Sequence, residues 1–114
     1  MDEHIHPLYM DQIRQLNPEI VVRAVGKIDA PPKGTLDPEI LKWCEQRQFL
    51  LVTNNRKSML PHLQDYLAEG RHIPGIIMLS QTMSIGDMIE ELVFLAIASE
   101  DNEFKDSIRH MPIV

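Results

Sequence analysis

Three short polar clusters contain the residues of this chain that are best suited to chemistry. Asp2 and Glu3 form the first cluster, Asp37 and Glu39 form the second, and residues 53–56 (Thr-Asn-Asn-Arg) form the third. Carboxylate oxygens, together with water and phosphate, are the ligands that Mg²⁺ takes in proteins. A cation held in this way activates water and neutralises phosphate charge in phosphodiester hydrolysis. If the fold brings the clusters together, they therefore predict metal-assisted hydrolysis.

The same residues also have a purely structural interpretation. Asp37 precedes Pro38 at a predicted helix start, where an aspartate caps free backbone N–H groups and a proline needs no donor. Glu39 is then a first-turn acid beside the helix dipole, and Asp2 is a chain end. Thr53 at the end of a strand satisfies a turn. Spacing alone leaves both interpretations open.

The elements that position these clusters follow from the apolar pattern. Short β-branched runs alternate with patterns of helical period, which is typical of an α/β fold. The predicted strands cover residues 20–25, 49–53, 73–79 and about 108–111. The predicted helices cover residues 8–16, 37–47, about 58–69 and about 84–99. Asp37 and Ser58 are the predicted N-caps of two helices, and Ser84 with Asp87 forms a capping box at the last.

Each helix must return the chain over a face of the sheet, so we predict right-handed crossovers and a doubly wound, mainly parallel sheet. Ligands of such sheets bind outside the carboxyl ends of the strands. Residues 53–56 directly follow a predicted strand. We therefore expect the three polar clusters to converge on this edge of the sheet.

The composition fits one ordinary globular domain: the 114 residues are 44% hydrophobic and 25% charged. The single cysteine, Cys44, excludes an internal disulfide and a multi-cysteine zinc site, and its apolar helical stripe predicts a buried hydrophobe. The net charge of −6 excludes a general nucleic-acid coat, so nucleic acid would be contacted locally, at residues such as Arg56 and Lys57. Residues 1–10 differ from a signal peptide and no apolar run approaches the roughly 20 residues of a membrane span, so we expect a cytoplasmic protein.

Residues 2–7 read Asp-Glu-His-Ile-His-Pro, residues 37–41 read Asp-Pro-Glu-Ile-Leu, and residues 51–56 read Leu-Val-Thr-Asn-Asn-Arg. In this order and spacing they resemble the bacterial PIN-like family, which is related to the PIN-domain ribonuclease toxins of toxin-antitoxin systems. The resemblance covers nearly the whole chain. It implies a three-layer α/β/α sandwich with a mainly parallel central sheet, and Mg²⁺- or Mn²⁺-dependent endonucleolytic cleavage of RNA. It also implies a homodimer and a small antitoxin-like protein as a partner.

The resemblance assigns roles to individual residues. Asp2, Asp37 and Asn55 match metal-ligand positions of the family, and Glu39 is the neighbouring alternative to Asp37. Thr53 matches the threonine of the family's Thr-x-Asp-x-Asp-Phe segment. The implied catalytic set is therefore Asp2, Asp37, Glu39, Thr53 and Asn55.

Three residues depart from the family pattern in and next to this set. Asn55 stands where the family usually has its first Asp, Lys57 where it has the second, and Ser58 where it has Phe. An amide oxygen ligates a cation without negative charge and a lysine repels one, so metal affinity and water activation should both fall. Two functions therefore remain open: a metal-dependent endoribonuclease, or a catalytically degenerate PIN-like module that binds a protein partner or RNA.

The family also has an apolar strand before its Asp-Glu pair, where this chain has only Met1. Either the natural start lies upstream of Met1, or a central strand is missing and its neighbours expose unpaired edges. We expect the first. Residues 1–114 are then a single PIN-like domain that lacks part of its first strand.

Overall fold

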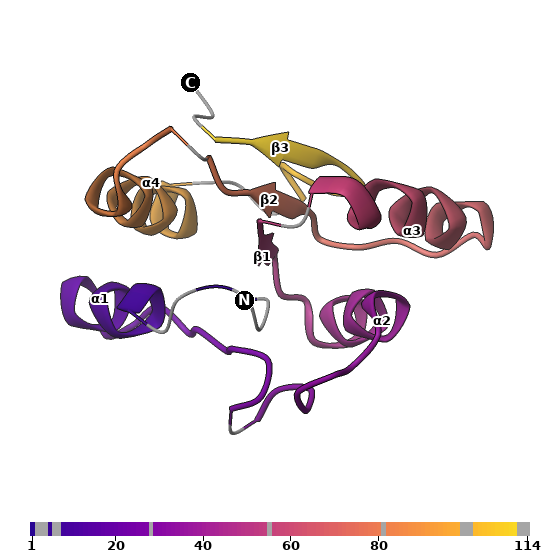
Figure 1. The fold of residues 1–114 in the computed structure, drawn as a ribbon, viewed down its shortest axis with the longest axis horizontal. Helices are drawn as coiled ribbons and strands as arrows, with labels where there is room; N and C mark the ends of the chain where they lie inside the picture. Colours follow the sequence, from indigo (N-terminus) through magenta and orange to yellow (C-terminus); the bar gives the residue numbers. More distant parts are fainter. Residues whose placement is uncertain are drawn as a thin grey trace.

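A computed structural model describes residues 1, 5, 8–27, 29–54, 56–80, 82–98 and 102–111, with the backbone alone at 56–58. Within these residues the chain forms four helices and three short strands, and from α2 onward each strand follows a helix (Figure 1). The elements in chain order are α1 (Leu8–Leu16), α2 (Asp37–Arg47), β1 (Leu51–Thr53), α3 (Arg56–Ala68), β2 (Ile76–Met78), α4 (Ile85–Ala98) and β3 (Ile108–His110).

The three strands form one parallel sheet in the order β1-β2-β3. Val52 pairs with Ile77, which in turn pairs with Arg109. Parallel neighbours need a crossover connection, and α3 and α4 supply the two crossovers. All residues of β1 and β2 are buried, whereas those of the edge strand β3 are half-buried or exposed. The prediction of an α/β fold with a parallel sheet is confirmed, although β1 and β2 are shorter than the predicted strands.

Alternate side chains of the strands enter two separate hydrophobic clusters. Val52 and Ile77 pack with buried residues of α1 and α4, whereas Leu51 and Ile76 pack with buried residues of α2 and α3. Successive side chains of a strand point to opposite faces of the sheet, so the two clusters lie on opposite faces. Figure 1 accordingly shows α1 and α4 on one side of the strands and α2 and α3 on the other.

The first and last helices form as their sequences predict. α1 buries Tyr9 and Ile13 against α4, and it ends before Asn17 and Pro18, since a residue before proline disfavours helical geometry. At the start of α4, the Ser84 hydroxyl accepts the N–H of Asp87 at 3.1 Å, which confirms the predicted cap. Helix α4 buries a stripe of apolar side chains, namely Met88, Ile89, Leu92 and Leu95.

Two other predicted caps are wrong. The N-cap residue of α2 is Leu36, whose carbonyl accepts the N–H groups of Glu39 and Ile40, and no side chain caps this helix. Asp37 is the first helical residue instead, and its carboxylate contacts the neighbouring helix α3. Helix α3 begins at Arg56, almost directly after β1, so Ser58 lies inside the helix and not at its cap.

Residues 20–25, predicted as a buried strand, are not a strand in the structure. Val22 and Val25 are buried as expected, but Val21 is 57% exposed. The apolar, β-branched composition of residues 20–25 predicts burial. A strand also requires a hydrogen-bonded neighbour. Among the described residues only Met1 provides such a neighbour: its amino group donates to the carbonyl of Arg23 and its carbonyl accepts the N–H of Val25.

Candidate functional site

Asp37 is a half-buried carboxylate between two helices. It lies in the first turn of α2, and its side chain is 22% exposed. Its Oδ2 atom lies 3.8 Å from Nε2 of His62 in the second turn of α3. This separation is too long for a direct hydrogen bond. The two side chains are thus neighbours in an ion-pair arrangement, and the carboxylate retains access to solvent.

The position of Asp37 relative to the sheet follows from the chain path. Helix α2 ends at Arg47 and leads almost directly into β1, so its first turn lies toward the far, carboxyl end of that strand. Helix α3 begins just after the same end, and Asp37 contacts its second turn. The carboxyl end of a parallel strand is the usual place for a ligand in such a sheet. The structure therefore places Asp37 on the edge where a ligand is expected.

Thr53 is the last residue of β1 and lies on the same edge. It is fully buried at 0% exposure, and its backbone carbonyl accepts the N–H of Leu79 at 2.9 Å. The residue after it, Asn54, is exposed. Thr53 thus fixes the end of the strand in the sheet, and Asn54 carries the chain out to the surface before α3 begins.

Glu39 does not share the position of Asp37. It is exposed and lies two residues further along α2. Residues two apart on a helix point to different sides, so one cation cannot be held by both carboxylates. Glu39 is therefore an alternative to Asp37 and not its partner.

The remaining predicted ligands, Asp2 and Asn55, lie outside the described residues. Within the described ranges no three side chains of His, Cys, Asp or Glu gather closely enough to hold a metal ion. A single half-buried carboxylate still fits Mg²⁺, because this ion keeps several waters and takes one or two carboxylates plus substrate phosphate. Of the predicted site residues that the structure describes, Asp37 is the half-buried carboxylate at this edge of the sheet.

Cys44 is not part of a reactive site. It is 4% exposed within α2, and burial raises the pKa of its thiol to about 11. A thiol with so high a pKa forms little thiolate, which is the nucleophilic species. The prediction of a small buried hydrophobe is confirmed.

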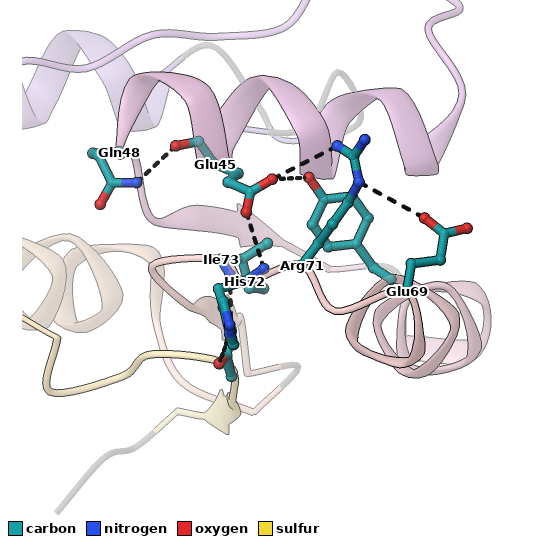
Figure 2. A network of polar contacts seen from close by, with 8 residues as sticks. Glu45, Gln48, Glu69, Arg71, His72 and Ile73 are labelled. Carbon is teal, nitrogen blue, oxygen red and sulfur yellow. Dashed lines mark hydrogen bonds and ion pairs between the residues drawn. The ribbon is translucent and has the colours of Figure 1, made fainter.

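A polar network that the sequence did not predict lies at the other end of α2 (Figure 2). One carboxylate oxygen of Glu45 accepts the Tyr66 hydroxyl at 2.5 Å, and the other accepts the backbone N–H of His72 at 2.9 Å. The guanidinium of Arg71 lies 5.5 Å from the centre of the Tyr66 ring and 3.8 Å from Glu45. The pKa of Glu45 is lowered, mainly by the hydrogen bond from Tyr66 and to a smaller extent by that from His72. The pKa of Tyr66 is raised, mainly by burial and to a smaller extent by its hydrogen bond to Glu45.

The network continues to the segment before β3. Nδ1 of His72 lies 2.7 Å from one carboxylate oxygen of Asp106, and the other oxygen accepts the N–H of Ile73 at 2.8 Å. Burial alone would raise the pKa of Asp106, but the hydrogen bonds from Ile73 and His72 hold it below its ordinary range. Glu45 and Asp106 thereby join α2, the α3–β2 connection and the approach to β3. These contacts lie toward the amino ends of the strands, away from Asp37, and we assign them to stability.

No family model, curated protein or solved structure matches this chain. Among the residues that the structure describes, none belongs to a helix long and apolar enough to cross a membrane.

Proposed function

We propose that this protein is a PIN-like, Mg²⁺- or Mn²⁺-dependent endoribonuclease that acts in the cytoplasm. The observation that supports the proposal most is the position of Asp37. Its half-buried carboxylate lies at the edge where β1 ends and α3 begins, which is where α/β sheets bind ligands. The sequence resemblance independently assigns a metal ligand to the same residue.

In this proposal Asp37 holds the cation together with Asp2 and Asn55. When bound, the cation supplies a Lewis acid that lowers the pKa of water and neutralises the phosphate charge of RNA. Thr53, which is fully buried at the end of β1, would act by holding the strand end beside these ligands. Since Asn55 adds no negative charge, Asp37 and Asp2 carry the electrostatic attraction for the cation.

We propose the three-layer α/β/α sandwich of the PIN-like family as the full fold. The two hydrophobic clusters on opposite faces of the sheet, each formed with a different pair of helices, support it. Two features of the described chain are incomplete for such a sandwich: its strands are short, and a cavity lies beside β1.

A second function, a degenerate PIN-like module that binds a protein partner or RNA, has its own support. Asn55 and Lys57 replace acids of the family pattern, and His62 lies 3.8 Å from Asp37, where a protonated imidazole competes with a cation. The exposed Phe94 and Ile97 of α4, at 66% and 62% exposure, favour a protein contact in either case. A homodimer and a small antitoxin-like protein are the partners that we propose.

Incubation of the purified protein with labelled single-stranded RNA in Mn²⁺, Mg²⁺ or EDTA separates the two functions. The nuclease proposal predicts cleavage that needs the metal and is lost in Asp37→Asn prepared identically. RNA binding without cleavage, equal in both proteins, supports the degenerate module instead. Cleavage that is equal in wild type, Asp37→Asn and EDTA comes from a contaminant and contradicts the nuclease proposal.

A further inference from the structure

Helix α4 carries an exposed apolar pair on the side that faces away from the core. Phe94 is 66% exposed and Ile97 is 62% exposed. They lie three residues apart and so share one side of the helix, opposite its buried stripe. Figure 1 shows α4 at the periphery of the described fold, where it packs against α1. Single exposed apolar side chains are common on protein surfaces, whereas two large neighbouring ones favour a contact with another molecule.

Two acidic residues of α4 lie in the same row as this pair. Asp87 and Glu90 are exposed, and the spacings from residue 87 to 90, 94 and 97 are three, four and three. Side chains at such spacings line one side of a helix. Within the described part of the chain, neither of the two carboxylates lies in an ion pair. These four residues, which we call the outer face of α4, thus combine two carboxylates with two large apolar side chains.

The segment around this face accounts for the net charge of the whole protein. Residues 84–104 contain six of the 17 Asp and Glu residues and none of the 11 Lys and Arg residues. The rest of the chain then has 11 acidic residues against 11 basic ones, so the net charge of −6 belongs to this segment. Two of the six acids, Glu100 and Asp101, lie outside the described residues. The exposed apolar pair therefore lies in a negative field that no basic residue of the segment interrupts.

This charge decides which class of molecule fits the outer face of α4. The phosphates of nucleic acids and the anionic surface of membranes are both repelled by it. A second copy of the same face would bring carboxylates against carboxylates, and like charges across an interface disfavour binding. A basic protein segment is attracted instead. A helix suits the shape, because the side-chain ridges of one helix pack into the grooves of another.

We propose that the outer face of α4 binds a basic amphipathic helix of another protein. The apolar stripe of that helix covers Phe94 and Ile97, and its Lys or Arg side chains contact Asp87 and Glu90. A homodimer of this protein then forms through another surface. The inference does not depend on the proposed nuclease, and its test measures binding and not cleavage, so that either proposal can fail alone.

Fluorescence anisotropy with three labelled peptides of about 14 residues tests the charge and the pattern of the partner. The first peptide is an amphipathic helix of Leu and Lys, the second has the same composition in an order without an apolar face, and the third is an amphipathic helix of Leu and Glu. We expect only the first to bind, with a Kd that rises by at least about threefold from roughly 50 to 300 mM salt. Absence of binding, or equal binding of either other peptide, overturns the inference.

Two variants of the full chain then test the position of the bound peptide. Phe94→Gln removes an apolar side chain from the outer face of α4, and Leu60→Gln is the matched control, because Leu60 is a 49% exposed apolar residue of α3. We expect Phe94→Gln to raise the Kd of the Leu-Lys peptide by at least about tenfold, as for a central aromatic anchor, and Leu60→Gln to change it by less than about twofold. Equal Kd values for wild type and Phe94→Gln contradict the proposed site.

Sedimentation of the same proteins tests the alternative occupant, a second copy of the chain. We expect the oligomeric state of Phe94→Gln to equal that of wild type. A wild-type dimer that Phe94→Gln converts to a monomer would show that a second copy covers this face, and it would overturn the inference.

Discussion

Nε2 of His62 lies 3.8 Å from Oδ2 of Asp37, across the contact between helices α2 and α3. The two helices are separated by β1 in the sequence, so this relationship exists only in the folded chain. It places the carboxylate of Asp37 beside the second turn of α3, at the carboxyl end of β1. Under the proposed function, a charged imidazole at this position would compete with the metal ion for the same carboxylate.

Replacement of His62 by glutamine should strengthen metal binding. A charge at about 4 Å contributes roughly 1 kcal/mol in water, which is about fivefold in Kd. We expect His62→Gln to lower the Kd for Mn²⁺ by up to about fivefold, because the variant removes the imidazole beside the Asp37 carboxylate. Calorimetric titration with Mn²⁺ measures this directly. Weaker binding in the variant would mean that His62 is itself a ligand.

Under the proposed function, an aspartate at residue 55 should raise activity. Asn55→Asp supplies the carboxylate that the PIN-like resemblance leads us to expect there, and we expect about tenfold faster RNA cleavage at limiting Mn²⁺, equivalent to roughly 1.4 kcal/mol. Asn54→Asp is the matched control, because it adds the same charge at the exposed preceding residue. Initial rates of cleavage compare the two variants. Equal rates for both would show that added charge alone, and not a ligand at residue 55, determines the effect.

Gly75 should tolerate no side chain. Its φ is 143°, and a Cβ atom placed on it would lie 2.6 Å from the carbonyl oxygen of Phe104. Backbone strain and overpacking together predict that Gly75→Ala lowers the free energy of unfolding by about 3 kcal/mol. Gly86→Ala in α4 meets no atom within 4 Å and should be neutral or stabilising by up to about 1 kcal/mol. Urea denaturation of both variants distinguishes this account from a general intolerance of glycine substitution.

The Glu45 network should make stability depend on pH in the acidic range. Its hydrogen bonds with Tyr66 and His72 hold the pKa of Glu45 below the ordinary value of 4.5. The stabilisation is therefore fully present above pH 4.5 and is lost as the pH falls through the lowered, folded-state pKa. Between pH 5 and 3 the Tm of wild type should fall more steeply than that of Glu45→Gln. Glu90→Gln, at an exposed site on α4, should follow the wild-type curve.

The parts of the fold that depend on local sequence could be predicted. Helix α1 ends before Asn17-Pro18, and α4 starts at the Ser84 cap, because the residues that determine these boundaries are neighbours in the chain. Residues 20–25 could not be assigned correctly, since a strand depends on a partner elsewhere. The contact of Asp37 with His62 and the bonds of Glu45 link residues 21 to 27 positions apart, and no periodic pattern encodes them.

The candidate site was predictable only in part for the same reason. The position of Asp37 at a helix start and of Thr53 at a strand end followed from the sequence, and both lie at one edge of the sheet. That Asp37 and Glu39 belong to different sides of α2 follows from helical spacing. Asp2 and Asn55, outside the described residues, remain ligands assigned by resemblance.

The most direct test of the proposed function compares RNA cleavage by wild type, Asp37→Asn and Glu39→Gln over a range of Mn²⁺ concentrations. All three proteins are purified identically, and circular dichroism confirms that each is folded. The proposal predicts that the cleavage rate of Glu39→Gln stays within about twofold of wild type, whereas that of Asp37→Asn falls by at least about 100-fold. Loss of a residue that only supports a metal ligand lowers activity by about 10- to 100-fold, and loss of the ligand itself should lower it at least as much. Equal metal-dependent rates for wild type and Asp37→Asn would contradict it.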